Sequence, residues 1–227
     1  MAPGRIHWSI GPGEKEDQVN IAIIGAGNVG RALAGSSVRA GHTVTLSSRS
    51  QEDAELCAKE TGAQAAGSNK DAVEAAAVAV FAVSYPDLDG LLAELGDALT
   101  GKIVVDVTNR MDPNDPAQAI DGTSAAEQIQ SRVPAARVVK AFNTVFAGRQ
   151  TDPIVDGIQL DGFVAGDDGQ AKATVLELVE SIGLRPIDAG SLSMARALEA
   201  LALLNITLNM RNGWSWQSGW KLVGPTG

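Results

Sequence analysis

The sequence is poor in the side chains that build metal sites and nucleophilic catalysis. Cys57 is the only cysteine, so an intrachain disulfide is impossible and a cysteine-rich metal site is excluded. His7 and His42 are the only histidines, which leaves little material for a zinc site or a catalytic triad. His42 also follows a predicted helix stop at Gly41, a place typical of a structural turn residue. We therefore expect neither a metal nor a Ser-His-Asp or Cys-His set.

Long apolar runs and excess positive charge are also missing. No run reaches the roughly 20 residues that span a bilayer, because Glu199 and Asn205 interrupt the longest candidate, residues 197–208. The net charge of −9 argues against nucleic acid or an anionic membrane as the main partner, since both attract a basic surface. Residues 1–18 are polar and lack the apolar core of a signal peptide. We expect a mobile arm there and a cytoplasmic protein.

What is present is a regular alternation of predicted strands and helices. Apolar, β-branched runs predict strands at residues 20–24, 43–47, 75–83, 102–107 and 137–142. Helical patterns follow at residues 28–40, at residues 51–60 and after Pro86. Repeated strand–helix–strand units build a parallel sheet with right-handed crossovers. The fold class predicted for residues 19–150 is therefore α/β, with a doubly wound parallel sheet of the Rossmann type.

The last third of the chain has a different pattern. A strand is compatible with residues 160–165, and Asp168 is placed to cap a helix that Gly183 ends. Ser191 begins another helix. Its apolar residues recur at helical spacing, at Met194, Leu198, Leu201, Leu204 and Leu208. We interpret residues 151–227 as a small C-terminal domain that is rich in α-helix.

A glycine-rich turn follows the first predicted strand and opens the first predicted helix. It reads Gly25-Ala26-Gly27-Asn28-Val29-Gly30, which fits the G-x-G-x-x-G pattern of dinucleotide sites. In that pattern Gly25 permits the tight turn, Gly27 lets the backbone approach a pyrophosphate, and Gly30 lets the helix lie close to the sheet. The N–H groups and positive dipole of the helix then face the diphosphate. Because the strand, turn, helix and second strand all fall into place, we predict a dinucleotide site.

The choice of dinucleotide is made about 20 residues further on, at the end of the second strand. An NAD enzyme places Asp or Glu there, but this chain has Ser48-Arg49. Arg49 can neutralise a 2′-phosphate with a planar set of donors, and Ser48 adds a hydroxyl donor. The alternative is a solvated surface charge at Arg49. We predict NADP.

The reactive end of the ligand is expected beyond the carboxyl ends of the strands. The residues there are Ser84-Tyr85, Thr108-Asn109-Arg110 and Asn143-Thr144. Lys140 could donate a proton, but its position inside a strand favours a charge that anchors the strand's edge. Asp106 fits buried hydrogen bonding to a loop better than general base work. Without a clear acid or base beside the hydride, the sequence favours a flavin or deazaflavin partner, which asks only for alignment of two rings.

Three tryptophans lie close together near the C-terminus. Trp214, Trp216 and Trp220 alternate with Gly213 and Gly219. Aromatic tails of this kind usually seal a core or a dimer seam. The alternative is a ring-stacking platform for a second cofactor.

Together these motifs resemble the F420-dependent NADP reductase family, whose NADP-binding module also occurs in the cytoplasmic domain of the STEAP metalloreductases. The resemblance covers residues 20–222. It is carried by Ile24 to Gly30, Ser48-Arg49, Val138-Val139-Lys140-Ala141-Phe142-Asn143-Thr144, Gly166-Asp167-Asp168, Gly183-Leu184-Arg185-Pro186-Ile187-Asp188-Ala189-Gly190 and Ser191-Leu192-Ser193.

The resemblance implies hydride exchange between NADPH and coenzyme F420, a deazaflavin, in a cleft between the Rossmann domain and the C-terminal domain. The C-terminal domain would then bind the acceptor or form the dimer. It also implies a homodimer. The glycine turn with Ser48 and Arg49 would hold the adenosine end of NADP. The nicotinamide end would be lined by Val83, Ser84, Asn109, Ala141 and Asn143.

Two departures from the archaeal reductases fall at the acceptor end. Those proteins tend to have Pro-Trp where this chain reads Ser84-Tyr85-Pro86, and His-Thr-Ile where it reads Phe142-Asn143-Thr144, closer to the metalloreductase form. The acceptor therefore stays open between F420, a flavin and another small molecule. Two further hypotheses are a small imine or 2-hydroxyacid reductase and a non-enzymatic NADP-sensing module.

Overall fold

A computed structural model of the chain describes residues 18–111 and 122–225. The arm predicted at residues 1–18 lies outside this part, except for Gln18, whose side-chain amide donates a hydrogen bond to the Thr43 hydroxyl at 2.8 Å. Among the described helices, none is long and apolar enough to cross a membrane. The cytoplasmic location stays a prediction.

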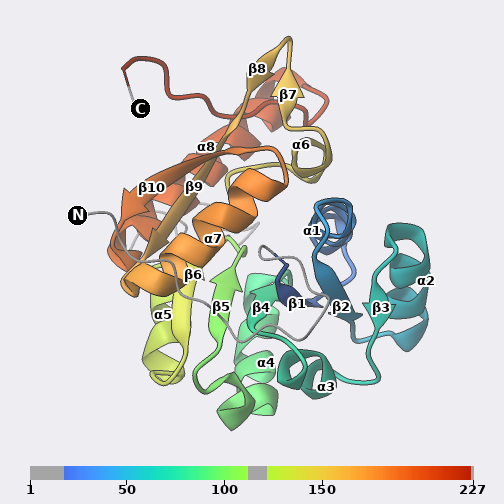
Figure 1. Ribbon diagram of the computed structural model, residues 1–227. Coiled ribbons are helices and arrows are strands. Elements are labelled where there is room, and N and C mark those ends of the chain that lie inside the picture. The colour runs from blue at the N-terminus through green and yellow to red at the C-terminus, as the bar shows by residue number, and fades with distance from the viewer. Residues whose placement is uncertain (1–17, 112–121, 226–227) are drawn as a thin grey trace.

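The centre of the molecule is one eight-stranded sheet with the order β10-β9-β6-β5-β4-β1-β2-β3 (Figure 1). Its strands are β1 (Asn20–Ile24), β2 (Thr43–Ser47), β3 (Gln64–Ala65), β4 (Val78–Phe81), β5 (Ile103–Asp106), β6 (Arg137–Lys140), β9 (Asp161–Gly166) and β10 (Arg185–Gly190). The strands from β1 to β6 pair in parallel, which confirms the predicted doubly wound sheet. β9 runs antiparallel to β6, and β10 runs parallel to β9. The C-terminal strands thus extend the same sheet, and a domain boundary at residue 150 stays a prediction.

Helices cover both faces of this sheet (Figure 1). They are α1 (Asn28–Arg39), α2 (Gln51–Thr61), α3 (Asn69–Glu74), α4 (Leu88–Leu95), α5 (Ala125–Arg132), α6 (Ala147–Thr151), α7 (Gly169–Ser181) and α8 (Ala195–Asn212). On one face, α1, α2 and α7 contribute Leu33, Ala54 and Val175 to a buried apolar core. On the other, α3, α4 and α5 contribute to a second core that includes Leu91 and Ile129. The sheet is therefore buried on both sides, which is why its strands read as continuous apolar runs.

Several short elements differ from the sequence prediction. The run at residues 75–83 forms a strand only over Val78–Phe81, because Ala75 closes α3 with its N–H bonded to the Asp71 carbonyl. β3 and the hairpin of β7 (Ile154–Val155) and β8 (Ile158–Gln159) have two residues per strand, too few for a recognisable alternation. β10 was not predicted because it is a half-buried edge strand that carries Arg, Pro and Asp.

The last helix, α8, forms as the spacing predicts but buries only part of the apolar set. Leu198 is buried, but Met194 and Leu204 are 41% and 49% exposed. The buried positions of α8 instead include Glu199, Asn205 and Asn209. Polar residues share the inward side of α8 because the helix meets the Lys140 cluster and the polar backbone and side chains of the C-terminal segment.

Candidate dinucleotide site

Two glycines of the turn after β1 are required by the fold itself. Gly25 has φ +117°, a conformation that side chains rarely adopt, and its N–H donates to the Ser47 carbonyl at 2.8 Å. A Cβ on Gly25 would overlap the carbonyl oxygen of Ala82, and a Cβ on Gly30 would overlap the carbonyl oxygen of Gly25. Glycine at position 25 therefore lets the turn lie against Ala82, and glycine at position 30 lets α1 lie against the turn.

Gly27 has no such internal reason to be glycine. Its φ of −71° suits any residue, and a Cβ there would meet nothing within 4 Å. It lies exposed at the start of α1, beside the half-buried Ala26 and the exposed Asn28. The space in front of Gly27 is open, so a ligand could approach the backbone there closely.

The N-terminus of α1 has no side-chain cap, which is also true of α4, α6 and α8. The starts of α2, α3, α5 and α7 are each capped by a side chain that accepts a backbone N–H, namely Ser50, Ser68, Ser124 and Asp168. At α1 the N-cap is Gly27, no side chain accepts a hydrogen bond, and the first turn has no acidic residue. The first N–H groups of α1, including those of Asn28 and Val29, are thus available to an anion.

Arg49 lies on the solvent side of the turn, just after β2. Its side chain is 86% exposed and forms an ion pair with Asp87, with 3.1 Å between Arg49 Nη1 and Asp87 Oδ1. Ser48 beside it is half-buried. The arginine is therefore free to reorient toward a ligand, and its position at the end of β2 is the one from which a 2′-phosphate is reached.

The residues predicted at the nicotinamide end follow β4, β5 and β6. Val83 and Ser84 come after β4, Asn109 after β5, and Ala141 and Asn143 after β6. The structure joins two of them directly: Asn143 Nδ2 donates to Asn109 Oδ1 at 2.9 Å. Ala141 is buried behind this pair, whereas Ser84 is exposed and donates to Asp87.

Asn143 also carries an unused hydrogen-bond acceptor. Its Nδ2 donates a second time, to the Leu198 carbonyl of α8 at 3.0 Å, so the amide cannot simply be turned over. Its Oδ1 is buried and has no hydrogen-bond partner. Such an atom is costly unless something donates to it, and a carboxamide N–H₂ is a donor of the right kind. Together with the open Gly27 and the uncapped α1, it fits a nicotinamide dinucleotide.

Lys140 lies in a buried cluster of charged side chains. Its Nζ lies 2.8 Å from Asp106 Oδ2 and 2.8 Å from Glu199 Oε1, and it also donates to the Thr108 carbonyl. Burial alone would lower the pKa of Lys140, but the two carboxylates outweigh it and the pKa lies above its usual value. Asp106 also accepts from the backbone and hydroxyl of Thr108 at 2.9 and 2.7 Å. Lys140 and Asp106 join strands and loops through buried ion pairs and hydrogen bonds, the arrangement that the sequence favoured.

Glu199 is the member of this cluster that sequence reasoning missed. Besides Lys140, it accepts the backbone N–H of Ala125 at 2.9 Å and that of Arg110 at 3.4 Å. Burial raises the pKa of Glu199, and the nearby Lys140 offsets this in part. Glu199 lies 59 positions after Lys140 in the chain. The only sign of its role in the sequence is that it is an acidic residue inside an otherwise apolar run.

The tryptophans of the C-terminal segment have different roles. The Trp216 ring meets Phe146 edge to face at a centroid distance of 5.4 Å, and both Trp214 and Trp216 are about half exposed. Trp220 is more covered, and its carbonyl accepts the N–H of Asp161 in β9 at 3.0 Å. The Trp220 backbone is therefore joined to the start of β9. Trp216 instead contacts Phe146, which lies three residues after Asn143 in the chain, and leaves part of its ring exposed.

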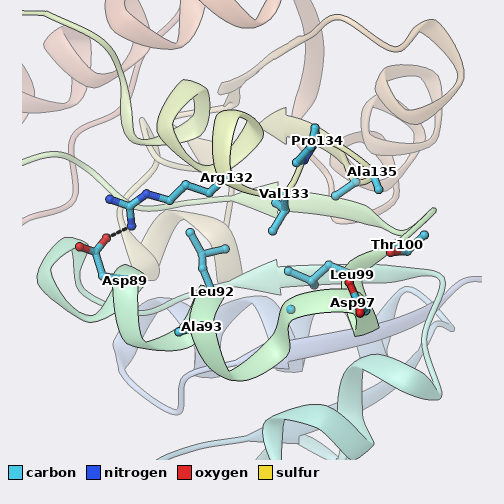
Figure 2. A pocket seen from close by; sticks show the side chains of 12 residues that line it. Asp89, Leu92, Ala93, Asp97, Leu99, Thr100, Arg132, Val133, Pro134 and Ala135 are labelled. Atoms are coloured by element: carbon cyan, nitrogen blue, oxygen red, sulfur yellow. Dashed lines mark hydrogen bonds and ion pairs between the residues drawn. The ribbon is translucent and has the colours of Figure 1, made fainter.

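A cavity of about 480 Å³ lies elsewhere, between α4 and α5 (Figure 2). Leu92, Leu99 and Val133 line it, and the Arg132–Asp89 ion pair stands at one end. It lies at the amino ends of β5 and β6, since Thr100 and Ala136 just precede those strands. The glycine turn and the asparagine pair lie at the carboxyl ends. This cavity is therefore separate from the dinucleotide site.

The fold and the turn together define a dinucleotide-binding protein of the doubly wound α/β class. Comparison with known proteins identifies the family. Residues 20–110 match the family model described as NADP oxidoreductase coenzyme F420-dependent. The F420-dependent NADP reductase of Methanothermobacter marburgensis is 31% identical over 212 residues, which cover 86% of this chain and 94% of that protein. The chain belongs to this family and is an NADP-dependent oxidoreductase.

Two further similarities define the extent of the match. A crystal structure of a putative F420-dependent NADP reductase from Arthrobacter sp. FB24 superposes with a TM-score of 0.82 at 31% identity, covering 91% of this chain and all of that one. The rat metalloreductase STEAP3 is 36% identical over 188 residues, which cover 81% of this chain but 36% of that protein. The chain thus spans about a third of the metalloreductase, and nearly the full length of the reductases.

Proposed function

We propose that this oxidoreductase transfers a hydride between NADPH and a deazaflavin of the coenzyme F420 type. The observation that carries the binding of the dinucleotide is Gly27, which is open to solvent at the uncapped start of α1. At the nicotinamide end, the described residues offer Asn109 and Asn143 but no free acid or base. Ketone and imine acceptors usually need such a group, because the proton goes to the atom bonded to the carbon that takes the hydride, whereas in a deazaflavin the proton goes to a ring nitrogen that is not bonded to that carbon. The names of the similar reductases, which are F420-dependent, support the deazaflavin.

Each part of the site has a task in this reaction. The turn at Gly25, Gly27 and Gly30 would seat the pyrophosphate on the N–H groups of α1, and Ser48 and Arg49 would hold the 2′-phosphate. Val83, Ser84 and Ala141 would border the nicotinamide end.

The asparagine pair has the orienting role. Asn143 Oδ1 would accept from the carboxamide and so fix which ring face is turned to the acceptor, while Asn109 holds the Asn143 side chain in place. The nicotinamide itself supplies the hydride when NADPH is bound. The balance is NADPH, deazaflavin and one proton giving NADP⁺ and the reduced deazaflavin. The chain contributes alignment and exclusion of water rather than acid–base chemistry.

The acceptor side is supported by the aromatic pair of Phe146 and Trp216. Trp216 has an exposed ring beyond Asn143, and a flat tricyclic acceptor can stack on such a ring. A Trp216→Ala variant should raise the KM for F420 and leave the Kd for NADPH unchanged. An unchanged KM for F420 would remove the platform from the proposal.

We also propose a homodimer. The outward face of α8 carries Leu201, Leu204 and Leu208, with Leu204 about half exposed, and this apolar stripe is a surface that a second copy can cover. Light scattering after size exclusion should give twice the chain mass, and Leu204→Glu should reduce it toward the monomer. A monomeric wild type at micromolar concentration would contradict this part.

The experiment for the reaction uses the full chain under anaerobic conditions. NADPH is added with F420, FMN, FAD, a ketone or a cyclic imine, and absorbance is followed at the bands of NADPH and of each acceptor. Reduction of F420 but not of FMN or FAD is the expected result. Turnover with the imine or ketone alone would overturn the deazaflavin in favour of a small reductase. Binding of NADPH without turnover of any acceptor would favour an NADP sensor.

A further inference from the structure

The ion pair between Arg49 and Asp87 crosses the mouth of the dinucleotide site. β1 lies between β2 and β4 in the sheet (Figure 1). Arg49 follows β2, and Asp87 ends the short 3₁₀ helix η1 (Tyr85–Asp87) that follows β4. A contact between them, with 3.1 Å from nitrogen to oxygen, therefore bridges the two strands that flank β1, where the glycine turn leaves the sheet.

Asp87 is held in place without help from Arg49. Its Oδ2 accepts a hydrogen bond from the Ser84 hydroxyl, and its backbone N–H donates to the Ser84 carbonyl at 3.0 Å. Arg49, in contrast, is 86% exposed, and Asp87 is only 36% exposed. The carboxylate is thus the fixed partner, and the guanidinium is the one that moves.

The charges nearest to Arg49 in the chain are also negative. α2 begins two residues after Arg49, and its first turn carries Glu52 and Asp53. Acidic residues at this position suit the helix dipole, but their negative charge does not favour binding of a phosphate nearby. Asp87 is thus the carboxylate that contacts Arg49, and the next charged residues along the chain are acidic as well.

We infer that Asp87 is a specificity-determining residue that weakens binding of the 2′-phosphate by competing for Arg49. The inference rests on the proposed role of Arg49. A 2′-phosphate carries between about −1.5 and −2 charges near neutral pH, so it must take the guanidinium from Asp87 and then remain close to that carboxylate. The ribose of NAD has a neutral 2′-hydroxyl, which can donate to a carboxylate instead. Asp87 therefore narrows the preference for NADP over NAD that Arg49 creates.

The expected size follows from Coulomb's law. Two such charges about 6 Å apart in a solvent-exposed site, screened by physiological salt, correspond to about a three- to tenfold change in Kd. The effect should shrink at high salt, because both the carboxylate and the phosphate are near solvent.

The test compares Asp87→Asn with the control Asp89→Asn. Asp89 is two positions away and pairs with Arg132, by the separate cavity (Figure 2). Isothermal titration with 2′,5′-ADP and 5′-AMP measures the phosphate contribution without the nicotinamide. Asp87→Asn should tighten 2′,5′-ADP about three- to tenfold and leave 5′-AMP within about twofold, while Asp89→Asn changes neither. Unchanged or weaker binding of 2′,5′-ADP by Asp87→Asn would overturn the inference.

Two arginine variants separate this inference from the function on which it rests. If Arg49→Ala weakens 2′,5′-ADP but not 5′-AMP, the assignment of Arg49 stands, and the Asp87→Asn result alone decides the inference. In the double variant, the gain from Asp87→Asn should be smaller than in the single variant, because competition for Arg49 is gone and only the direct repulsion between the carboxylate and the phosphate remains. If Arg49→Ala changes both ligands equally, the 2′-phosphate assignment fails and takes the inference with it. The deazaflavin proposal is untouched by either result.

Discussion

The open space in front of Gly27 makes a single added methyl group the sharpest probe of the site. In Gly27→Ala the new Cβ meets nothing within 4 Å and the φ of −71° suits alanine, so the folded chain has no reason to change. Alanine is a weaker N-cap than glycine by about 0.5–1 kcal/mol, and it also restricts the unfolded chain, which acts in the opposite direction by about 0.4–1 kcal/mol. The free energy of unfolding should therefore stay within about 1 kcal/mol of wild type.

Binding of NADPH should respond quite differently. The methyl group would stand where the pyrophosphate must approach the first turn of α1. Losing one or two hydrogen bonds to a charged group costs about 1.5–3 kcal/mol each, which corresponds to a rise in Kd of at least about tenfold. The assay is isothermal titration of NADPH together with a thermal melt of the free protein.

Gly25→Ala and Gly30→Ala are the matched controls. Their new Cβ atoms would overlap the carbonyl oxygens of Ala82 and Gly25, so both variants should melt at a lower temperature even without ligand. If Gly27→Ala binds NADPH as wild type does, the placement of the pyrophosphate is refuted. If Gly27→Ala instead melts like the two controls, the argument that its glycine serves a ligand is wrong.

Other variants test the rest of the site and its frame. Arg49→Glu should raise the KM for NADPH much more than that for NADH, and equal effects on both would remove Arg49 from the 2′-phosphate site. Lys140→Met leaves two carboxylates buried together and should destabilise the fold by about 3–5 kcal/mol in urea unfolding; a pH profile of kcat that moves in a milder Lys140→Arg variant would instead make it a proton carrier. Hydrogen bonds from Arg196 hold the pKa of Glu127 down from 4.5 to about 2, so its stabilisation is complete above pH 4.5 and is lost as the pH falls through about 2. Glu127→Gln should lower the melting temperature at pH 7 by an amount equivalent to about 1 kcal/mol, because Arg196 is half exposed. The difference in melting temperature from wild type should disappear between pH 4.5 and 2. A difference that does not change with pH would contradict the lowered pKa.

The part of the fold nearest the glycine turn could be predicted because local pattern and tertiary role agree there. β1, α1 and β2 each show the periodicity of their structure, and the glycines stand where backbone must approach backbone. The family motifs extended this to Asn109 and Asn143, which the structure joins by a hydrogen bond. Their individual roles toward NADP stay predictions.

What could not be predicted depends on contacts between distant parts of the chain. Glu199 meets Lys140 only because α8 buries this glutamate beside the β6 lysine, a contact between distant parts of the chain that the apolar spacing of α8 does not indicate. The partner of Arg49 is 38 positions away, on a turn whose own sequence shows no relation to β2. The short strand β3 and the edge strand β10 lack periodicity and form because a neighbouring strand pairs with them.

Direct hydride transfer is the central claim, and an isotope label tests it in one measurement. NADPH carrying deuterium at the transferable position of C4 is mixed anaerobically with stoichiometric protein and F420, and the products are analysed by mass spectrometry. A deazaflavin receives the hydride on carbon, where it does not exchange with water. The account predicts that the reduced deazaflavin carries the deuterium. Reduced deazaflavin without deuterium, or NADPH that binds and stays unoxidised, would contradict it.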